Sequence, residues 1–399
     1  MKPAALRARL TQLAAQHLQR RRRTVTAVGA GFGPMVQVDG RRAVNFCGND
    51  YLGLNCHPKL AAAMSECAAL AGAGSGASHL VSGHGLEHEK LEEELAQFTG
   101  RARALLFSTG YMANLAAITS LAERDGRVVM DRLCHASLID AARLSGARLK
   151  RFAHGDCAAA DVMLRGGSGS GADLLVTEGV FSMDGDLAPL PQLAQAASAA
   201  NACLIVDDAH GLGVMGPTGR GCLEHFNLGT SAVPVLVGTL GKALGCFGAF
   251  VAADEDYIEW LLQTARSYIY TTALPQPVAA AARAALAVTV AEPWRRERVL
   301  ELTARLRHGA AGCGMALLPS DSPIQPLVLG SSARALAVSE QLFAAGYWVA
   351  AIRAPTVPRG TARLRITLTA AHSEEQVDGL LGALDQALRA TPDLPHAAA

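Results

Sequence analysis

The chain has 399 residues, which exceeds one ordinary domain and predicts a large domain with a smaller one. Its 36 basic and 35 acidic residues almost cancel, which excludes the basic footprint of a nucleic-acid-binding protein and favours a small-molecule substrate. Half of the residues are hydrophobic but only 5% are aromatic, a composition typical of α/β proteins that pack Ala-rich helices on strands of Val and Leu.

The N-terminal segment is basic and is predicted to be helical. It carries no acidic residue before Asp39 and includes four consecutive arginines, Arg20–Arg23. The leucines near helical spacing are Leu6, Leu10, Leu13 and Leu18. An organellar transit peptide is the alternative, but such peptides are usually rich in serine and this segment is not. We expect residues 1–48 to form an N-terminal helical arm.

The central region, from Tyr51 to Thr272, alternates short apolar runs with helical segments, which predicts a mostly parallel sheet with helices on both faces. The predicted strands are Ala104–Phe107, Arg127–Asp131, Asp173–Thr177, Ala202–Asp207, Pro234–Thr239 and Phe247–Ala252. After Ala273 a long helical stretch rich in Ala and Arg precedes further strands. These strands are expected near Leu327, Trp348 and Leu364. We therefore predict a large domain over residues 49–280 and a smaller α/β domain over 281–399.

Charged residues follow one of these apolar strands directly. The segment ACLIVDDAHGLG (202–213) leads from the strand into a glycine-rich turn that carries Asp207, Asp208 and His210. Open α/β sheets bind ligands beyond the carboxyl ends of their strands, so an acid at this position can meet a cofactor. A solvated loop acid is the alternative interpretation.

The next strand ends in TLGKA (239–243), which places Lys242 at another strand end. Burial disfavours the ammonium form of a lysine, and a neutral amine can form a Schiff base with an aldehyde, as pyridoxal phosphate requires. A Walker A phosphate loop is the alternative. It requires a glycine where this chain has Leu236 and Ser or Thr where it has Ala243, so both requirements fail.

Two further strand ends offer an anion site and a planar ring. Residues Ser108–Asn114 open an apolar helix, and helix N-termini bind anions such as a cofactor phosphate through free amides. His135 follows another strand and could stack on a pyridine ring, although a lone histidine is as often structural. At successive strand ends, Asp207 could keep a pyridine nitrogen protonated while Lys242 carries and releases a substrate imine.

Two rival motifs occur in unsuitable contexts. His84–His88 matches the H-x-x-E-H zinc pattern, which needs a helix with both histidines on one face, whereas Gly83 and Gly85 oppose a helix. The glycine-rich residues 72–76 follow an Ala-rich helical stretch rather than the strand that a dinucleotide-binding loop requires. We therefore expect no metal ligands in the chain.

Several segments resemble the α-oxoamine synthases, a family of fold-type I pyridoxal-phosphate enzymes. These segments are NDYLGL (49–54), GSGASHLVSG (74–83), GYMAN (110–114), TEGVFSMDGD (177–186), VDDAHGLG (206–213), TLGKALG (239–245) and GTARLRITLTAAH (360–372). The agreement runs nearly end to end. The resemblance implies a mostly parallel seven-stranded sheet in the large domain, a smaller C-terminal α/β domain, pyridoxal 5'-phosphate as cofactor and a homodimer.

By this resemblance, Lys242 would hold the cofactor and act as the proton-transfer base, Asp207 would pair with the pyridinium nitrogen and His135 would stack on the ring. Arg365 would bind the amino-acid carboxylate through a bidentate pair. The other implied cofactor contacts are Gly110 and Tyr111 at the phosphate, Ser182, Thr239, His210 at the phenolic oxygen, and Thr272 at the phosphate of the second subunit. The other implied substrate contacts are Arg21, Asn49, Thr356 and His135.

The resemblance is strongest to the branch of this family that makes a biotin precursor. AIRAPTVP (351–358) resembles the IRPPTVP version of that branch, with Ala354 in place of a proline, and FAHGD (152–156) and Arg21 also resemble it. The implied reaction condenses L-alanine with pimeloyl-coenzyme A or a pimeloyl acyl carrier protein, with loss of carbon dioxide. Glycine C-acetyltransferase and 5-aminolevulinate synthase, which prefer glycine, are the alternatives within the family.

The nine cysteines are scattered, with no C-x-x-C pair, which predicts reduced thiols rather than a disulfide or zinc scaffold. No apolar run approaches the roughly 20 residues that span a bilayer. We expect a cytoplasmic protein with small-molecule substrates, a possible acyl carrier protein as partner, and neither nucleic acid nor membrane as partner.

Overall fold

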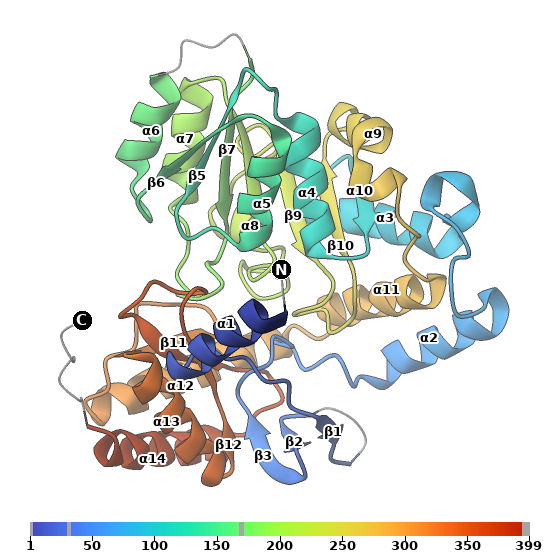
Figure 1. Cartoon of the computed structure of the whole chain (residues 1–399). Coiled ribbons are helices and arrows are strands. Elements are labelled where there is room, and N and C mark those ends of the chain that lie inside the picture. The colour runs from blue at the N-terminus through green and yellow to red at the C-terminus, as the bar shows by residue number, and fades with distance from the viewer. Residues whose placement is uncertain (1–2, 30–32, 167–170, 393–399) are drawn as a thin grey trace. The chain divides into compact units, whose positions relative to one another are not determined.

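The structure, a computed structural model, describes residues 3–29, 33–166 and 171–392. The chain forms two compact units (Figure 1). The sheet unit comprises Asp50–Ser182 and Asp186–Arg296, and the terminal unit comprises Met1–Asn49, Met183–Gly185 and Glu297–Ala399. Parts of the predicted arm and of the predicted small domain thus belong to one unit, while the boundaries at residues 48 and 280 stay a prediction.

The sheet unit is built around a seven-stranded sheet in the order β4-β10-β9-β8-β7-β5-β6. Its strands are β4 (Arg103–Phe107), β5 (Arg127–Asp131), β6 (Arg148–Phe152), β7 (Leu174–Glu178), β8 (Cys203–Asp207), β9 (Val235–Thr239) and β10 (Ala249–Ala253). Among the described strands of this sheet, β10 alone runs in the opposite direction to the other six. The expected mostly parallel sheet and its six predicted strands are confirmed, with small shifts at the strand ends.

Most strands of the sheet are apolar on both faces and are fully buried, because helices cover both faces. On one face, alternate strand residues such as Val128 and Met130 pack on α4 (Gly110–Leu121), α5 (Ala136–Ser145) and α9 (Glu255–Thr264). The unit's other helices are α2 (Pro58–Ala71), the π-helical turn η1 (His79–Gly83), α3 (Leu86–Thr99), α6 (Cys157–Arg165), α7 (Leu190–Ala199), α8 (Cys222–His225), α10 (Arg266–Ile269) and α11 (Gln276–Ala291). The parallel strands end at one edge, where their loops carry the candidate site residues.

The edge strand β6 was not predicted from the sequence. Its segment RLKRF contains three basic residues, and four of its five residues are exposed or half-buried. Charged side chains are typical of edge strands because they discourage pairing with another chain. An edge strand of this kind lacks the apolar run by which the other strands were recognised.

The terminal unit corrects the expectation of a wholly helical arm. Helix α1 (Pro3–Ala15) ends before Leu18 and is followed by the strands β1 (Val25–Ala27), β2 (Met35–Val38) and β3 (Arg41–Asn45). Buried residues alternate along β2, which is the period of a strand rather than a helix. Strand β12 (Tyr347–Trp348) completes a four-stranded sheet in the order β1-β2-β3-β12.

The rest of the terminal unit has the α/β pattern predicted for the C-terminal region. A second sheet has the order β11-β14-β13, formed by β11 (Ile324–Gly330), β14 (Ala362–Thr367) and β13 (Ala350–Ile352). The helices are α12 (Trp294–Gly312), α13 (Ser332–Ala344) and α14 (Glu374–Ala390). The expected long helical stretch after Ala273 is two helices, α11 and α12, because Pro293 separates them.

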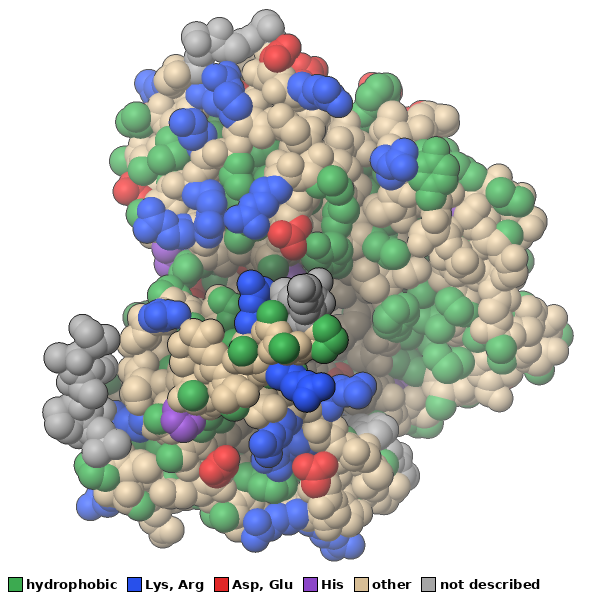
Figure 2. Space-filling model, viewed as in Figure 1, with side chains coloured by type: hydrophobic (Ala, Val, Ile, Leu, Met, Phe, Trp, Pro, Cys, Tyr) green, Lys and Arg blue, Asp and Glu red, His purple; other side chains and the backbone are tan. Residues whose placement is uncertain are grey.

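In the described ranges, no helix is both long and apolar enough to cross a bilayer. On the face shown in Figure 2, basic side chains form several separate groups with acidic side chains among them. This distribution agrees with the near-zero net charge of the sequence.

Candidate cofactor site

The lysine that follows β9 is hydrogen-bonded to the histidine that follows β8. The Nζ atom of Lys242 lies 2.7 Å from Nε2 of His210, and Nδ1 of the same ring lies 2.6 Å from the hydroxyl oxygen of Tyr51. His210 and Tyr51 are buried, whereas Lys242 is half-buried. The two bonds hold the ε-amine at the edge where the parallel strands end. Tyr51 lies in the NDYLGL segment, but no role was predicted for it from the sequence.

Asp207 ends β8 and is held on both carboxylate oxygens. Its Oδ2 atom accepts a hydrogen bond from Nδ2 of Asn114 (2.7 Å), and its Oδ1 atom accepts one from the backbone amide of Ala209 (3.0 Å). The side chain is only 7% exposed. The bonds therefore fix the orientation of a buried carboxylate that the sequence predicted to lie at this edge.

His135 belongs to the same network. Nδ2 of Asn114 also donates to Oγ of Ser137 (2.9 Å), and that hydroxyl lies 2.7 Å from Nδ1 of His135. The backbone amide of Ser137 also donates to Nδ1 (3.3 Å), so this nitrogen is an acceptor and the ring proton is on Nε2. Burial lowers the pKa of His135, more than the nearby Asp207 raises it. At neutral pH the ring is thus neutral, with one N–H at Nε2.

Two further buried acids lie beside Asp207. Glu178 ends β7 opposite Asp207, and its Oε2 atom accepts a hydrogen bond from the amide of Ser182 (3.2 Å). Burial and then the charge of Asp207 raise the pKa of Glu178 to about 8, and burial raises that of Asp208 to about 7. Among the described residues nothing bonds to Oε1 of Glu178 or to Oδ1 of Asp208. Glu178 was not predicted from the sequence as a site residue.

The N-terminus of α4 has the form expected of an anion site. Oγ1 of Thr109 accepts a hydrogen bond from the amide of Met112 (3.3 Å), which caps the helix. Apart from the adjacent residues and the backbone of α4 itself, no atom lies within 4 Å of the position that a Cβ on Gly110 would occupy, so the space beside this glycine is open. The exposed Tyr111 donates to Oδ2 of Asp140 (2.9 Å). Free amides of the first helical turn can therefore reach an anion here.

The other predicted cofactor contacts also lie in the sheet unit. Ser182 is buried after β7. Thr239 ends β9, where its hydroxyl donates to the carbonyl of Gly248 (3.1 Å) and accepts from the amide of Gly241 (3.2 Å), which shapes the turn before Lys242. Thr272 is exposed after α10. Their contacts with a cofactor stay predictions.

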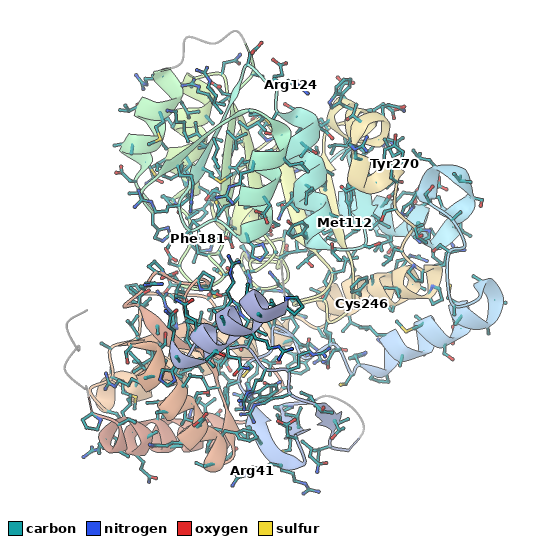
Figure 3. All side chains as sticks on the ribbon, viewed as in Figure 1. Arg41, Met112, Arg124, Phe181, Cys246 and Tyr270 are labelled. Atoms are coloured by element: carbon teal, nitrogen blue, oxygen red, sulfur yellow. The ribbon has the colours of Figure 1, made fainter. Side chains whose placement is uncertain are left out.

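His154, from the FAHGD segment, joins two acids. Its Nδ1 atom lies 3.1 Å from both carboxylate oxygens of Asp131, and its Nε2 atom lies 2.9 Å from Oδ2 of Asp186. The ring also meets that of Phe181, which is labelled in Figure 3, edge-on with centroids 4.4 Å apart. Burial lowers the pKa of His154, but hydrogen bonds to Asp131 and then Asp186 outweigh this and raise it to about 10. The contact fastens the loop that carries Ser182 to the end of β5.

Replacement of His154 by glutamine is expected to remove a pH-dependent part of the stability. Because the folded pKa is raised, the cation stabilises the fold fully below about pH 6.5, and this contribution is lost as the pH rises to about 10. With solvent screening of this half-exposed group, the free energy of unfolding at about pH 6 should fall by about 1–2 kcal/mol. Urea unfolding at about pH 6, 8 and 10 measures the difference. A difference that is constant across this range would contradict the assignment.

The predicted substrate contacts Arg21, Asn49, Thr356 and Arg365 all lie in the terminal unit. Arg365 is buried on β14, and its Nη1 atom donates to Oδ1 of Asn49 (3.1 Å). Arg20, rather than Arg21, reaches the hydroxyl of Thr356, at 3.4 Å. Arg21 lines a cavity of about 650 Å³ together with Arg353. The structure thus pairs Asn49 with Arg365.

The residues at the edge of the sheet unit suit pyridoxal phosphate. A half-buried amine, a buried carboxylate and a neutral histidine lie close enough to influence one another electrostatically. The buried Oε1 atom of Glu178 is an unsatisfied polar atom in the same surroundings. With the open helix N-terminus at Gly110, these features supply an amine for the aldehyde, an acid for the pyridine nitrogen and amides for the phosphate.

Comparisons with known proteins identify the family and its cofactor. The family model described as aminotransferase class I and II matches residues 41–384. The 8-amino-7-oxononanoate synthase of Cellvibrio japonicus is 55% identical over 386 residues, which cover 97% of this chain and 96% of that protein. A structure of SPT (serine palmitoyltransferase) with a PLP (pyridoxal phosphate) internal aldimine has a TM-score of 0.89 at 31% identity, and the match covers 97% of both chains. The 8-amino-7-oxononanoate synthase of Francisella tularensis has a TM-score of 0.76 at 31% identity, over 86% of this chain and 97% of that one.

The family match spans most of the chain, and the fold-type I architecture, the pyridoxal-phosphate cofactor and the enzymatic nature expected from the sequence are confirmed. The chain belongs to the class I and II aminotransferase family, and within it to the group of the 8-amino-7-oxononanoate synthases.

Proposed function

We propose that this enzyme condenses L-alanine with a pimeloyl thioester, with loss of carbon dioxide, to form 8-amino-7-oxononanoate for biotin synthesis. The observation that carries the proposal is the 55% identity, over 97% of the chain, to a protein named for that product. The arrangement of Lys242, His210 and Asp207 in the sheet unit supports it, because each side chain has the chemistry that the reaction needs.

Each of these residues has a distinct task in the proposal. Pyridoxal phosphate, when bound, supplies an electron sink for the charge that develops at the Cα atom of alanine. Lys242 holds the cofactor and moves the proton at Cα, while His210 fixes the ε-amine through its 2.7 Å bond. Asp207 keeps the ring nitrogen protonated, and Asn114 keeps Asp207 in place. His135 stacks on the cofactor ring. The contacts with Ser137 involve only Nδ1 of His135, so the Nε2–H group can donate to and polarise the acyl carbonyl oxygen.

The terminal unit supplies the proposed substrate contacts. Arg365 binds the carboxylate of alanine, because a guanidinium can donate two parallel hydrogen bonds to a carboxylate, and Asn49 orients it. Arg21 and Thr356 bind the acyl substrate. The acyl group arrives on coenzyme A or on an acyl carrier protein.

Substrate preference tests the proposal directly. We expect the purified holoenzyme to release carbon dioxide and free thiol fastest with L-alanine and pimeloyl-coenzyme A. Glycine in place of alanine, and acetyl- or succinyl-coenzyme A in place of the pimeloyl thioester, should each lower kcat/KM by at least about tenfold. A preference for glycine with acetyl- or succinyl-coenzyme A would favour glycine C-acetyltransferase or 5-aminolevulinate synthase instead. A parallel assay with a pimeloyl acyl carrier protein distinguishes the two acyl carriers.

We also propose a cytoplasmic homodimer. A cavity of about 900 Å³ lies among α2, α3 and α11, where the exposed Leu70 and Val290 lie beside charged residues such as Glu94 and Arg283, a mixture that suits burial against a second copy. In that assembly the exposed Thr272 would reach the cofactor phosphate of the second subunit. The nine cysteines are free thiols, as is usual in a reducing compartment.

A further inference from the structure

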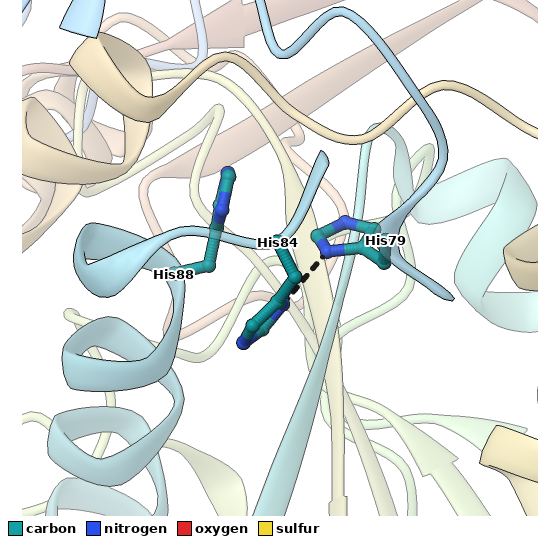
Figure 4. A group of neighbouring side chains, drawn as sticks. All are labelled: His79, His84 and His88. Carbon is teal, nitrogen blue, oxygen red and sulfur yellow. Dashed lines mark hydrogen bonds between the residues drawn. The ribbon is translucent and has the colours of Figure 1, made fainter. Parts of the chain in front are cut away.

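Three histidines with no task in the proposed reaction gather in the sheet unit (Figure 4). His79 opens the turn η1, His84 follows that turn, and His88 lies in the first turn of α3. The Nδ1 atoms of His79 and His84 lie 2.9 Å apart, and the three ring centroids are 5.0–5.4 Å from one another. One ligand nitrogen of each residue lies within 4.8 Å of those of the other two.

Two glycines determine where His84 lies. The amide of Gly83 donates to the carbonyl of Ser78, which closes the π-helical turn, a type of turn that is frequent at functional sites. A Cβ on Gly83 would overlap the carbonyl of Ala77, and a Cβ on Gly85 would overlap the side chain of Gln276. The same glycines keep His84 off α3, as the sequence predicted, and hold it where His79 can meet it. The cluster was not predicted from the sequence, because His84 and His88 match only a zinc pattern that requires a helix and His79 lies outside that pattern.

The hydrogen bonds of His88 fix its tautomer, with the ring proton on Nε2 and the lone pair on Nδ1. Its Nε2–H donates to the backbone carbonyl of Leu274, while Nδ1 accepts from the amide of Gly85 (2.9 Å). Metal-binding histidines typically donate their second ring N–H to a carbonyl in this way. The ring of His79 stacks on that of Tyr268 with centroids 4.8 Å apart, which fixes its orientation.

The cluster is neutral and lies in slightly acidic surroundings. Burial lowers the pKa of all three histidines, that of His79 to about 3, so at neutral pH no proton has to leave before a metal binds. Among the described residues, none of the three forms an ion pair with an acid. Glu89, close by on α3, nevertheless adds negative charge that favours a cation, whereas the charge of Glu87 is paired with Arg283.

We propose that His79, His84 and His88 bind a divalent transition-metal ion such as Zn²⁺, with a fourth position left for water. Three imidazole nitrogens suit Zn²⁺ rather than Mg²⁺ or Ca²⁺, which prefer oxygen ligands. Zn–N bonds of about 2.0–2.1 Å place the nitrogens of tetrahedral ligands about 3.4 Å apart. The Nδ1 atoms of His79 and His84, now 2.9 Å apart, therefore have to separate slightly, and ligand nitrogens that are up to 4.8 Å apart have to approach each other. His84 is exposed and can rotate to allow this. On binding, the proton between His79 and His84 moves to Nε2 of the ring that carries it, so both Nδ1 atoms can face the ion, and the ion displaces the Gly85 amide from Nδ1 of His88.

Zinc binding by the holoenzyme tests the proposal. The protein is stripped of metal with a chelator and dialysed against micromolar ZnCl₂. The number of bound zinc ions is then measured by mass spectrometry, and the unfolding temperature of the protein is measured with and without zinc. We expect the wild-type chain to retain one Zn²⁺ that His84→Ala loses, with affinity lowered on the order of 100-fold or more. Zinc should raise the unfolding temperature of the wild-type chain but not that of the variant.

His308→Ala is the matched control, because His308 is exposed on α12 and lies outside the cluster. It should bind zinc as the wild-type chain does, so any zinc held by the nine cysteines cancels in the comparison. Since His84 is exposed, its replacement should leave the fold and the cofactor absorbance intact. Equal zinc binding by His84→Ala and the wild-type chain, or no zinc on the wild-type chain, would overturn the proposal.

Discussion

Lys242→Ala is expected to abolish turnover while the protein stays folded. The ε-amine is the proposed attachment point of the cofactor and the proposed base, and it is hydrogen-bonded to His210, whose ring cannot replace a primary amine. Loss of a positioned base alone costs about 10²–10⁴-fold, so kcat should fall by at least about 10³-fold. The visible absorbance band of the Schiff base between Lys242 and the cofactor should disappear with it. Steady-state kinetics and absorbance spectra measure both effects.

Lys150→Ala is the matched control, because Lys150 is an exposed lysine on the edge strand β6. Its spectrum and kcat should equal those of the wild-type chain. Circular dichroism verifies that Lys242→Ala is folded, which is expected since the half-buried side chain is not part of the hydrophobic core. An unchanged cofactor spectrum in Lys242→Ala would refute the lysine assignment.

Much of the sheet could be predicted because its strands are buried on both faces. A doubly buried strand such as β9 reads as a continuous apolar run bounded by turn signals, which a sequence displays directly. The strands β1–β3 were missed for the opposite reason. Their residues are mostly exposed or half-buried, and although β1, β2 and β3 pair with one another locally, β3 also pairs with β12, some 300 residues later in the chain. Such distant pairing leaves no local signal.

The site was predicted in its types of residue but not in its contacts. Asp207, Lys242 and His135 follow apolar strands, and this position alone marks them as candidates. The link through Asn114 and Ser137 joins three separate segments, so no spacing in the sequence reveals it. The different environments of Asp207 and Asp208 are likewise not visible in the sequence. The sequence shows Asp207 and Asp208 side by side, but only the fold distinguishes the two environments.

Because Asp207 and Asp208 have different environments, their replacement by asparagine is expected to change kcat by different amounts. Asp207 is bonded on both oxygens and lies in the network with Asn114, whereas Asp208 lies in a tight pocket where its Oδ2 atom accepts from the amide of Cys222 (2.6 Å). Burial raises the pKa of Asp208 to about 7, so it is partly neutral at physiological pH. An amide in its place removes little charge. An amide in place of Asp207 removes the group proposed to hold the pyridine nitrogen protonated.

Asp207→Asn is therefore expected to lower kcat about 10²–10³-fold while part of the cofactor stays bound. The amide keeps the size of the side chain and can still accept from Asn114, but it cannot stabilise a proton on the ring nitrogen. Asp208→Asn, the matched control one residue away, should stay within about tenfold of the wild-type kcat. Kinetics and cofactor content, measured together for both variants, separate weaker binding from slower chemistry. Similar losses in the two variants, or near-normal turnover of Asp207→Asn, would mean that the charge at Asp207 does not assist the reaction.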